Sequence, residues 1–195
     1  MTDNISPRPG RALDPTKRAA ILDGARVVFL RDGFAQGSMD AVAAEAGVGK
    51  QTICRHFRSK EILVAALVEA MCSPDVVQPP PSALPARERI RALLLAFVAG
   101  VASPDGIRLY RAIVAEAGRV PELGRLFWEA GPRHLRAAIA QLWADEHGAA
   151  TAPLVAEQLV HLTLGDAYQE LVLGTGSPGP AVFERQIDAA LALLG

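Results

Sequence analysis

Five side chains between residues 50 and 56 have the chemistry to bind a polyanion. They are Lys50, Gln51, Thr52, Arg55 and His56. Each can donate a hydrogen bond, and none is acidic. Donors of these types bind phosphate oxygens and the edges of bases. We therefore expect them to form the outward face of a helix that contacts double-stranded DNA.

The stretch 38–60 is predicted to be two short helices joined by a tight turn. Ser38 suits the cap of the first helix, because its hydroxyl can accept from a free backbone N–H. Gly47 suits its end, because glycine takes the left-handed conformation without a Cβ clash. In the second helix Ile53 and Phe57 are four residues apart and form its buried face.

An upstream helix completes this unit. Asp14-Pro15 is a helix start, with a capping residue followed by proline at the first helical position. Gly33 is expected to end this helix. We therefore predict a three-helix DNA-binding domain over 14–60, preceded by a disordered arm over 1–13.

The charge distribution agrees with binding of a polyanion by one end of the chain. Residues 1–60 carry ten Lys and Arg against six Asp and Glu, whereas the rest of the chain carries ten against fifteen. The overall net charge is only −1. A basic lobe on an acidic body is typical of proteins that bind nucleic acid through one surface. The alternative is a chance asymmetry.

The composition favours an all-α protein. Half of the 195 residues are apolar, but only 5% are aromatic, which suits an alanine- and leucine-rich helical chain. From residue 86 onward the apolar positions recur at helical spacing, and no strand or hairpin pattern is apparent. With the N-terminal unit, roughly nine or ten helices are expected.

The remaining ionisable residues do not form a catalytic or metal-binding pattern. Glu157 and His161 are four residues apart, but a metal site needs more ligands. We expect no catalytic residue, no metal and no cofactor; an all-α enzyme or metal protein is the rival hypothesis. The histidines are scattered along the chain at His56, His134, His147 and His161.

The chain also lacks the signals of export and membrane insertion. The first residues contain no apolar core of a signal peptide. No run of about 20 apolar residues occurs. The cysteines, Cys54 and Cys72, are too few for a disulfide framework. We expect a cytoplasmic, nucleoid-associated protein with no membrane partner.

The rest of the chain, 61–195, is predicted to be a separate helical domain. A helix over 60–71 starts directly after the DNA-facing helix and links it to this domain. The proline-rich stretch 73–85 interrupts the helices, because three consecutive prolines cannot lie inside one.

The final two helices are predicted to form a homodimer. The helix over 153–173 is apolar on more than one face, and the helix from 180 to 194 has one strong apolar stripe. The simplest partner is the same pair from a second copy about a two-fold axis; the alternative is a core within one chain. The expected interface residues are Val155, Leu159, Leu162, Phe183, Ile187 and Leu191.

Several short motifs resemble those of the TetR/AcrR family of transcriptional regulators. In the C-terminal part, Leu109-Tyr110-Arg111, Val114-x-Glu116 and Val120-Pro121-Glu122-Leu123 resemble the ligand-binding and dimerisation domain of the AefR-like branch. The N-terminal resemblance covers roughly residues 15 to 70 and lies in Gly33-Phe34, Ser38…Ala43…Gly47-Val48, Lys50-x-Thr52-Ile53-x-Arg55-His56-Phe57 and Ser59-Lys60-Glu61.

The resemblance implies a two-fold dimer on a pseudo-palindromic DNA operator. By position it implies contacts to bases or grooves from Lys50, Gln51, Thr52 and Arg55. It implies contacts to phosphates from Thr52, His56 and Lys60, and Ser38 completes the expected DNA-binding set.

Two positions depart from the family pattern. Gly49 replaces the usual Ser or Thr and gives a weaker helix cap. Cys54 replaces the usual Tyr, so the phenol that contacts the DNA backbone in the family is missing from each subunit; Arg55 or Arg58 is the alternative donor. A redox role is one hypothesis for Cys54, because basic residues lie beside it. The alternative is that Cys54 is a small side chain that only fills space.

The expected function is a ligand-responsive regulator, acting as a repressor that a small apolar or amphipathic inducer releases. A constitutive dimeric DNA-binding protein without inducer is the alternative. Core packing is the competing role for each pocket residue. The expected pocket lies among the helices of 86–173 and uses Phe97, Tyr110, Phe127, Trp128, Trp143, His161 and Tyr168.

Overall fold

The computed structural model describes residues 14–72 and 84–194, and this part of the chain contains helices and no strand. The predicted all-α class is confirmed. The expected arm at 1–13 and most of the proline-rich loop, 73–83, lie outside the described residues. The elements are α1 (Pro15–Gln36), α2 (Met39–Glu45), α3 (Lys50–His56), α4 (Lys60–Cys72), α5 (Ala86–Val101), α6 (Pro104–Ala117), α7 (Pro121–Trp128), a π-helical turn η2 (Glu129–Arg133), α8 (His134–His147), α9 (Ala152–Leu173) and α10 (Pro180–Ala192).

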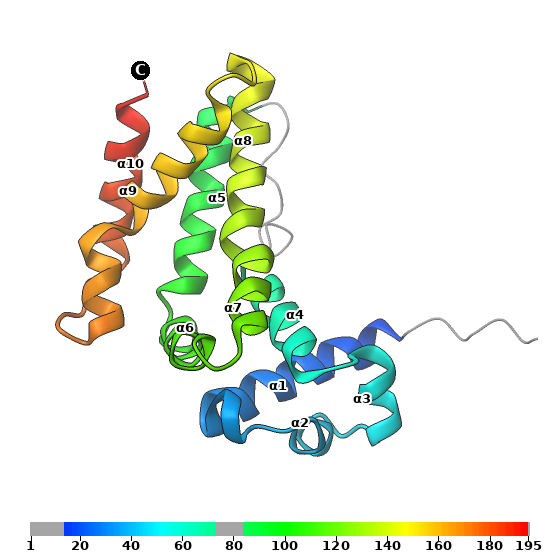
Figure 1. The fold of residues 1–195 in the computed structure, drawn as a ribbon. Coiled ribbons are helices and arrows are strands. Elements are labelled where there is room, and N and C mark those ends of the chain that lie inside the picture. Colours follow the sequence, from blue (N-terminus) through cyan, green and yellow to red (C-terminus); the bar gives the residue numbers. More distant parts are fainter. Residues whose placement is uncertain (1–13, 73–83, 195) are drawn as a thin grey trace, which may run out of the picture.

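The helices form two packed groups. Helices α1, α2 and α3 lie together at one end, and α5, α8, α9 and α10 run side by side in the body (Figure 1). Helix α4 leads from the first group to the second. Helix α6 lies across the base of the body and packs on α1.

One apolar core joins the first group to part of the body. It contains side chains from α1 to α4, including Ile21, Ile53 and Leu63, none of which is exposed. It also contains Leu109 of α6 and Leu123 of α7. A second core lies between α5, α8, α9 and α10. Helices α6 and α7 therefore share a hydrophobic core with the N-terminal helices.

The start of the first helix follows its sequence. The carboxylate of Asp14 accepts from the backbone N–H of Thr16 at 3.0 Å, and Pro15 follows as the first helical residue. Gly33 has φ 75° and breaks the regular helix, but the chain makes one further turn to Gln36. The rings of Phe29 and Phe34 meet across this break with centroids 6.2 Å apart.

Two features of the body depart from simple helices. Gly131 and Pro132 do not split the helix around them, because the chain widens into the π-helical turn and continues into α8. Helix α9 is broken at Gly165, which has φ 44° and ψ −155°. The apolar pattern of this segment predicts one uninterrupted helix, so the break is a correction.

No single helix in 14–72 or 84–194 is long and apolar enough to cross a membrane; α5 and α6 pass that test only as a pair bent by 71°.

Candidate nucleic-acid interface

The helix-turn-helix consists of α2 and α3. The hydroxyl of Ser38 caps α2 by accepting from the backbone N–H of Ala41 at 3.1 Å. Gly47 has φ 63°, a conformation that glycine adopts without a Cβ clash, and turns the chain toward α3. Helix α3 then begins at Lys50, with Ile53 fully buried on its inner face. The predicted cap, turn and second helix are all present.

A glycine on α1 determines how closely α2 approaches. A Cβ built on Gly24 would lie 3.0 Å from the backbone nitrogen of Ala46 and 3.2 Å from the carbonyl oxygen of Val42. Any larger residue would have to push α2 away. Gly24 therefore fixes the crossing that holds the helix-turn-helix, a role for which the apolar spacing gives no sign.

The outward face of α3 carries donors. Lys50, Gln51 and Arg55 are exposed, and Thr52 is partly exposed. Cys54 is an exposed free thiol four residues after Lys50, on the same side of the helix. Gly49 precedes α3 and has no side chain with which to cap it.

Lys50 has an acidic partner on α2. Its Nζ donates to Oδ2 of Asp40 at 3.0 Å, and this hydrogen bond raises the pKa of Lys50 above its usual value. Both side chains remain largely exposed. Asp40 therefore holds the lysine at the start of α3 and competes with a phosphate for it.

Lys60 is turned into the protein, although a phosphate contact is expected from it. Its Nζ donates to the carbonyl oxygen of Phe34 at 2.6 Å and to that of Gly37 at 3.1 Å. It also lies 4.2 Å from the centroid of the Phe34 ring. Two of the three ammonium donors thus satisfy the turn after α1 and tie it to the start of α4.

His56 is also covered, contrary to the expected phosphate contact. Both ring nitrogens are buried, and neither has a hydrogen-bond partner within the described part of the chain. The ring lies beside that of Phe57, with centroids 6.4 Å apart. At the last turn of α3 this side chain packs inward, so a DNA contact would need another rotamer.

Arg18 lies next to the end of α3, although α1 separates it from this face in sequence. Its guanidinium carbon is 5.7 Å from the centroid of the Phe57 ring. This contact brings the exposed N-terminal turn of α1 beside α3 and adds a cation there. The sequence signal is the basic pair Lys17-Arg18 in the first turn of the upstream helix.

Three of the expected pocket residues meet inside the body. The ring centroid of Tyr110 lies 5.8 Å from those of Phe127 and Tyr168. All three border a small cavity of about 30 Å³, which Val68 of α4 also lines. We call this space the aromatic cavity. It lies against the helix that leads to α3.

The other four expected pocket residues lie elsewhere and do not border the aromatic cavity. Phe97 is buried in the core of the body and does not border the aromatic cavity. Trp143 stacks on the His147 ring at 3.9 Å. Trp128 lies on the surface beneath the guanidinium of Arg136, and His161 lies 3.1 Å from Nη2 of Arg136.

Family models match both parts of the chain. A model described as bacterial regulatory proteins, tetR family, matches residues 21–67, which include α2 and α3. A model described as AefR-like transcriptional repressor, C-terminal domain, matches residues 88–194, more than half of the chain. The chain belongs to the TetR family. The predicted resemblance is confirmed in both its parts.

Curated relatives of this TetR-family chain are regulators rather than enzymes. The HTH-type transcriptional regulator BetI of Rhizobium meliloti is 30% identical over 122 residues, 60% of each protein. The DNA-binding transcriptional repressor TetR of Mycobacteroides abscessus is 44% identical over 55 residues, 28% of this chain and 29% of that protein. The chain thus covers less than two thirds of these relatives' lengths.

Solved structures extend the similarity to nearly the whole chain. A TetR-family transcriptional regulator from Mesorhizobium loti has a TM-score of 0.72 and 27% identity, over 92% of this chain and 95% of that chain. The flavonoid-responsive regulator FrrA has a TM-score of 0.68 and 31% identity over the same shares.

In this TetR-family chain most of the expected dimer residues lie inside the subunit. Leu159, Phe183, Ile187 and Leu191 are at most 2% exposed, because α9 and α10 pack on each other and on α5 and α8. Val155 is partly buried in the same core. The expected place of the four buried residues at the interface is therefore corrected, and of the six expected residues only Leu162 is exposed, at 44%.

Potential metal ligands are scattered over the described residues. Within residues 14–72 and 84–194, no group of three or more His, Cys, Asp and Glu side chains could hold a metal ion. His161 faces Arg136 across α8 and α9.

Proposed function

We propose that this protein binds a pseudo-palindromic operator as a two-fold dimer and represses transcription until a small ligand releases it. The observation that carries this proposal is the exposed, donor-rich face of α3, with Lys50, Gln51 and Arg55. Side chains of these types can read base edges in the major groove, which is wide enough for a helix.

Residues around this face of α3 would contact the phosphate backbone of the DNA. Ser38 uses its oxygen as a helix cap but keeps its hydroxyl proton for a phosphate. Thr52 and the exposed Arg58 add donors at the two ends of α3, and Arg18 adds one from α1. These contacts supply affinity that is independent of sequence and falls with salt.

The outer faces of the last two helices would join two copies. Leu154, Leu162 and Leu173 of α9 and Leu193 beyond α10 are 44% to 76% exposed. Large exposed apolar side chains on adjacent helices favour association, and a two-fold axis would cover each set with its copy. The two α3 helices must then lie about 34–36 Å apart to enter successive major grooves.

Helix α6 would transmit the state of the body to the DNA-binding helices. Arg111 of α6 donates to the carbonyl oxygens of Leu171 and Val172 at the end of α9, both at 2.7 Å. In the first turn of α6, Asp105 pairs with Arg26 of α1 at 3.6 Å. A ligand needs a coupling free energy of about 1–3 kcal/mol to change operator affinity 5- to 150-fold.

The relatives support ligand response and repression. FrrA is named as flavonoid-responsive, and the C-terminal family model describes a transcriptional repressor. The expected ligand is apolar or amphipathic, since Tyr110 and Tyr168 offer aromatic surface with hydroxyl groups at the aromatic cavity.

A constitutive DNA-binding dimer is the second candidate, and one observation favours it. The aromatic cavity measures only about 30 Å³, which is far below the roughly 300–1,000 Å³ of typical ligand sites. A ligand therefore has to open it by moving side chains such as Phe127. Operator affinity that no small molecule changes, in a protein that binds none, would support this candidate.

The proposal is tested by retardation of DNA from upstream of the protein's own gene over a salt series. We expect a discrete complex whose affinity falls steeply as salt rises, because Lys and Arg release counterions from the phosphates. Absence of a complex, or an affinity that does not depend on salt, would refute the DNA-binding proposal.

A further inference from the structure

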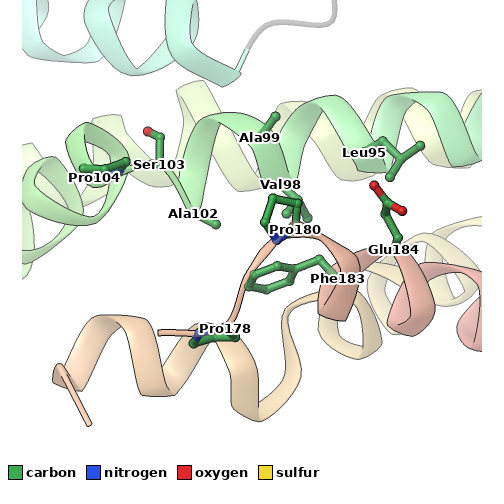
Figure 2. Close-up of a pocket in the computed structure, with 10 residues that line it drawn as sticks. All are labelled: Leu95, Val98, Ala99, Ala102, Ser103, Pro104, Pro178, Pro180, Phe183 and Glu184. Atoms are coloured by element: carbon green, nitrogen blue, oxygen red, sulfur yellow. The ribbon is translucent and has the colours of Figure 1, made fainter. Parts of the chain in front are cut away.

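A groove lies between α5 and the start of α10, and it shares no lining residue with the aromatic cavity. Its volume is about 490 Å³, within the range of roughly 300–1,000 Å³ that small-molecule sites occupy. Leu95 and Val98 of α5 form one wall, and Pro180 and Phe183 form the other (Figure 2). The groove ends at Ser103 and Pro104, where α5 gives way to α6.

We infer that this groove is a second small-molecule site, which takes an apolar molecule with a cationic end. Among the described lining residues, Glu184 is the only charged side chain, and the others apart from Ser103 are apolar. The Glu184 carboxylate rises from α10 toward Leu95 at the rim (Figure 2). An ammonium group can pair with it, whereas a carboxylate would be repelled.

The remaining polar group of the lining is already satisfied. The hydroxyl of Ser103 donates to the carbonyl oxygen of Gly100 at 2.6 Å and accepts from the backbone N–H of Gly106 at 2.9 Å. It caps α6 and is not available to a ligand. Glu184 therefore decides the charge that the groove prefers.

A cation already lies near Glu184, but it has a better partner. Arg91 of α5 gives two hydrogen bonds to Asp188, from Nε at 2.6 Å and from Nη2 at 3.2 Å. This bidentate pair ties α5 to α10 beyond Leu95 and Glu184. Two donors of Arg91 are engaged there, and Arg91 acts on Glu184 through its charge without a hydrogen bond to it among the described residues, so the Glu184 carboxylate can still receive a ligand's ammonium group.

The groove touches the connection to the DNA-binding helices. Pro104, which lines it, is the first residue of α6, and Asp105 follows directly and pairs with Arg26 of α1. A molecule seated against Pro104 is therefore one residue from this contact. The inference that an occupied groove changes operator affinity rests on the proposed function. The inference that the groove binds a small molecule does not.

The binding test uses three probes that share one skeleton: 4-phenylbutylamine, 4-phenylbutanol and 4-phenylbutyrate. Binding to the full chain is measured by ligand-observed NMR and calorimetry. We expect the amine to bind about fivefold more tightly than the alcohol, the scale of one partly exposed ion pair, and the carboxylate more weakly than both. Glu184→Gln should remove the preference for the amine.

Two variants locate the binding. Ala99→Trp places a large side chain in the lining at an exposed position, so the fold should persist, which circular dichroism checks. It should abolish binding of all three probes. Asp23→Asn, an exposed carboxylate on α1, should leave binding unchanged. Failure of the amine to bind, or amine binding that neither Glu184→Gln nor Ala99→Trp alters, would overturn the inference.

A separate measurement distinguishes this inference from the proposed function. Operator DNA is titrated with the protein with and without 4-phenylbutylamine. Loss of DNA affinity in the wild type but not in Ala99→Trp supports the regulatory role of the groove. Amine binding without any change in DNA affinity would refute the regulatory role of the groove but would still support the binding site. A protein that binds the amine but no DNA removes the proposed function instead.

Discussion

Arg26 of α1 and Asp105 of α6 lie 3.6 Å apart and form an ion pair between the DNA-binding helices and the body. Asp105 also accepts from Arg108 on its own helix, at 2.5 Å. The Asp105 carboxylate at the start of α6 thus interacts with Arg26 of α1 and with Arg108 of its own helix. This arrangement makes the first turn of α6 the polar part of the contact with α1, beside the shared core.

A double-mutant cycle should detect this ion pair. With Arg26→Gln, Asp105→Asn and the double variant, urea unfolding should give a coupling of about 0.2–1 kcal/mol, because both side chains are partly exposed and screened. Arg108→Gln is the matched control, since its pair with Asp105 lies within α6. A coupling of zero for Arg26 would show that the core alone joins α1 to α6.

Lys60 should act through stability rather than through phosphate contact. Lys60→Met removes two hydrogen bonds to the carbonyl oxygens of Phe34 and Gly37. We expect a loss of about 1–3 kcal/mol in the free energy of unfolding, because partly buried acceptors lose their partner. The slope of DNA affinity against salt should stay unchanged. An unchanged stability with a slope lower by about one phosphate contact would restore the phosphate role.

Gly165 should be needed for the break in α9. Its φ of 44° lies in a region that other residues rarely adopt, and an added Cβ would lie 2.9 Å from Nε2 of Gln186. Gly165→Ala should therefore destabilise the protein by about 1–3 kcal/mol in urea unfolding. Gly118→Ala is the control, because Gly118 has φ −69° and space for a Cβ. Equal stability of both variants would mean that α9 straightens without cost.

The Arg91–Asp188 pair should make stability depend on acid pH. The hydrogen bond from Arg91 holds the pKa of Asp188 below its usual value of 3.8. The folded protein therefore binds this proton less readily than the unfolded chain. The pair stabilises the fold above the unfolded pKa, and this contribution is lost as pH falls through the folded pKa.

Asp188→Asn should accordingly lower the urea midpoint at neutral pH, and the difference from the wild type should shrink as pH falls below about 4. Asp23→Asn is the control, because Asp23 forms no ion pair with another described residue. A difference that stays constant with pH would assign the effect to packing instead.

Local signals in the sequence are sufficient to predict the DNA-binding helices. The caps at Asp14 and Ser38, the turn at Gly47 and the buried face of α3 depend on neighbours within a few residues, so spacing alone predicts them. Lys60 illustrates the limit. Its partner carbonyls lie 26 and 23 residues earlier, and only the folded chain brings them within reach.

The same limit explains the errors in the body. Periodicity shows that Leu159 and Ile187 are buried, but it does not show whether α5 and α8 or a second subunit covers them. Likewise, aromatic residues at helical spacing do not reveal which of them meet; Tyr110 and Tyr168 do, whereas Trp143 stacks on its neighbour His147. No pattern in the sequence predicts the groove beside Glu184, since its walls come from helices that are distant in the chain.

The most direct test of the account is base selection by Arg55. The operator is first defined by footprinting DNA upstream of the gene, and affinities for operator and scrambled DNA are then measured by fluorescence anisotropy. Arg55→Ala should lose about 1–3 kcal/mol of discrimination between the two. Arg119→Ala, which removes an arginine with an 80% exposed side chain just after α6, should lose none. If both variants discriminate as the wild type does, α3 does not read the operator through Arg55 and the central claim is wrong.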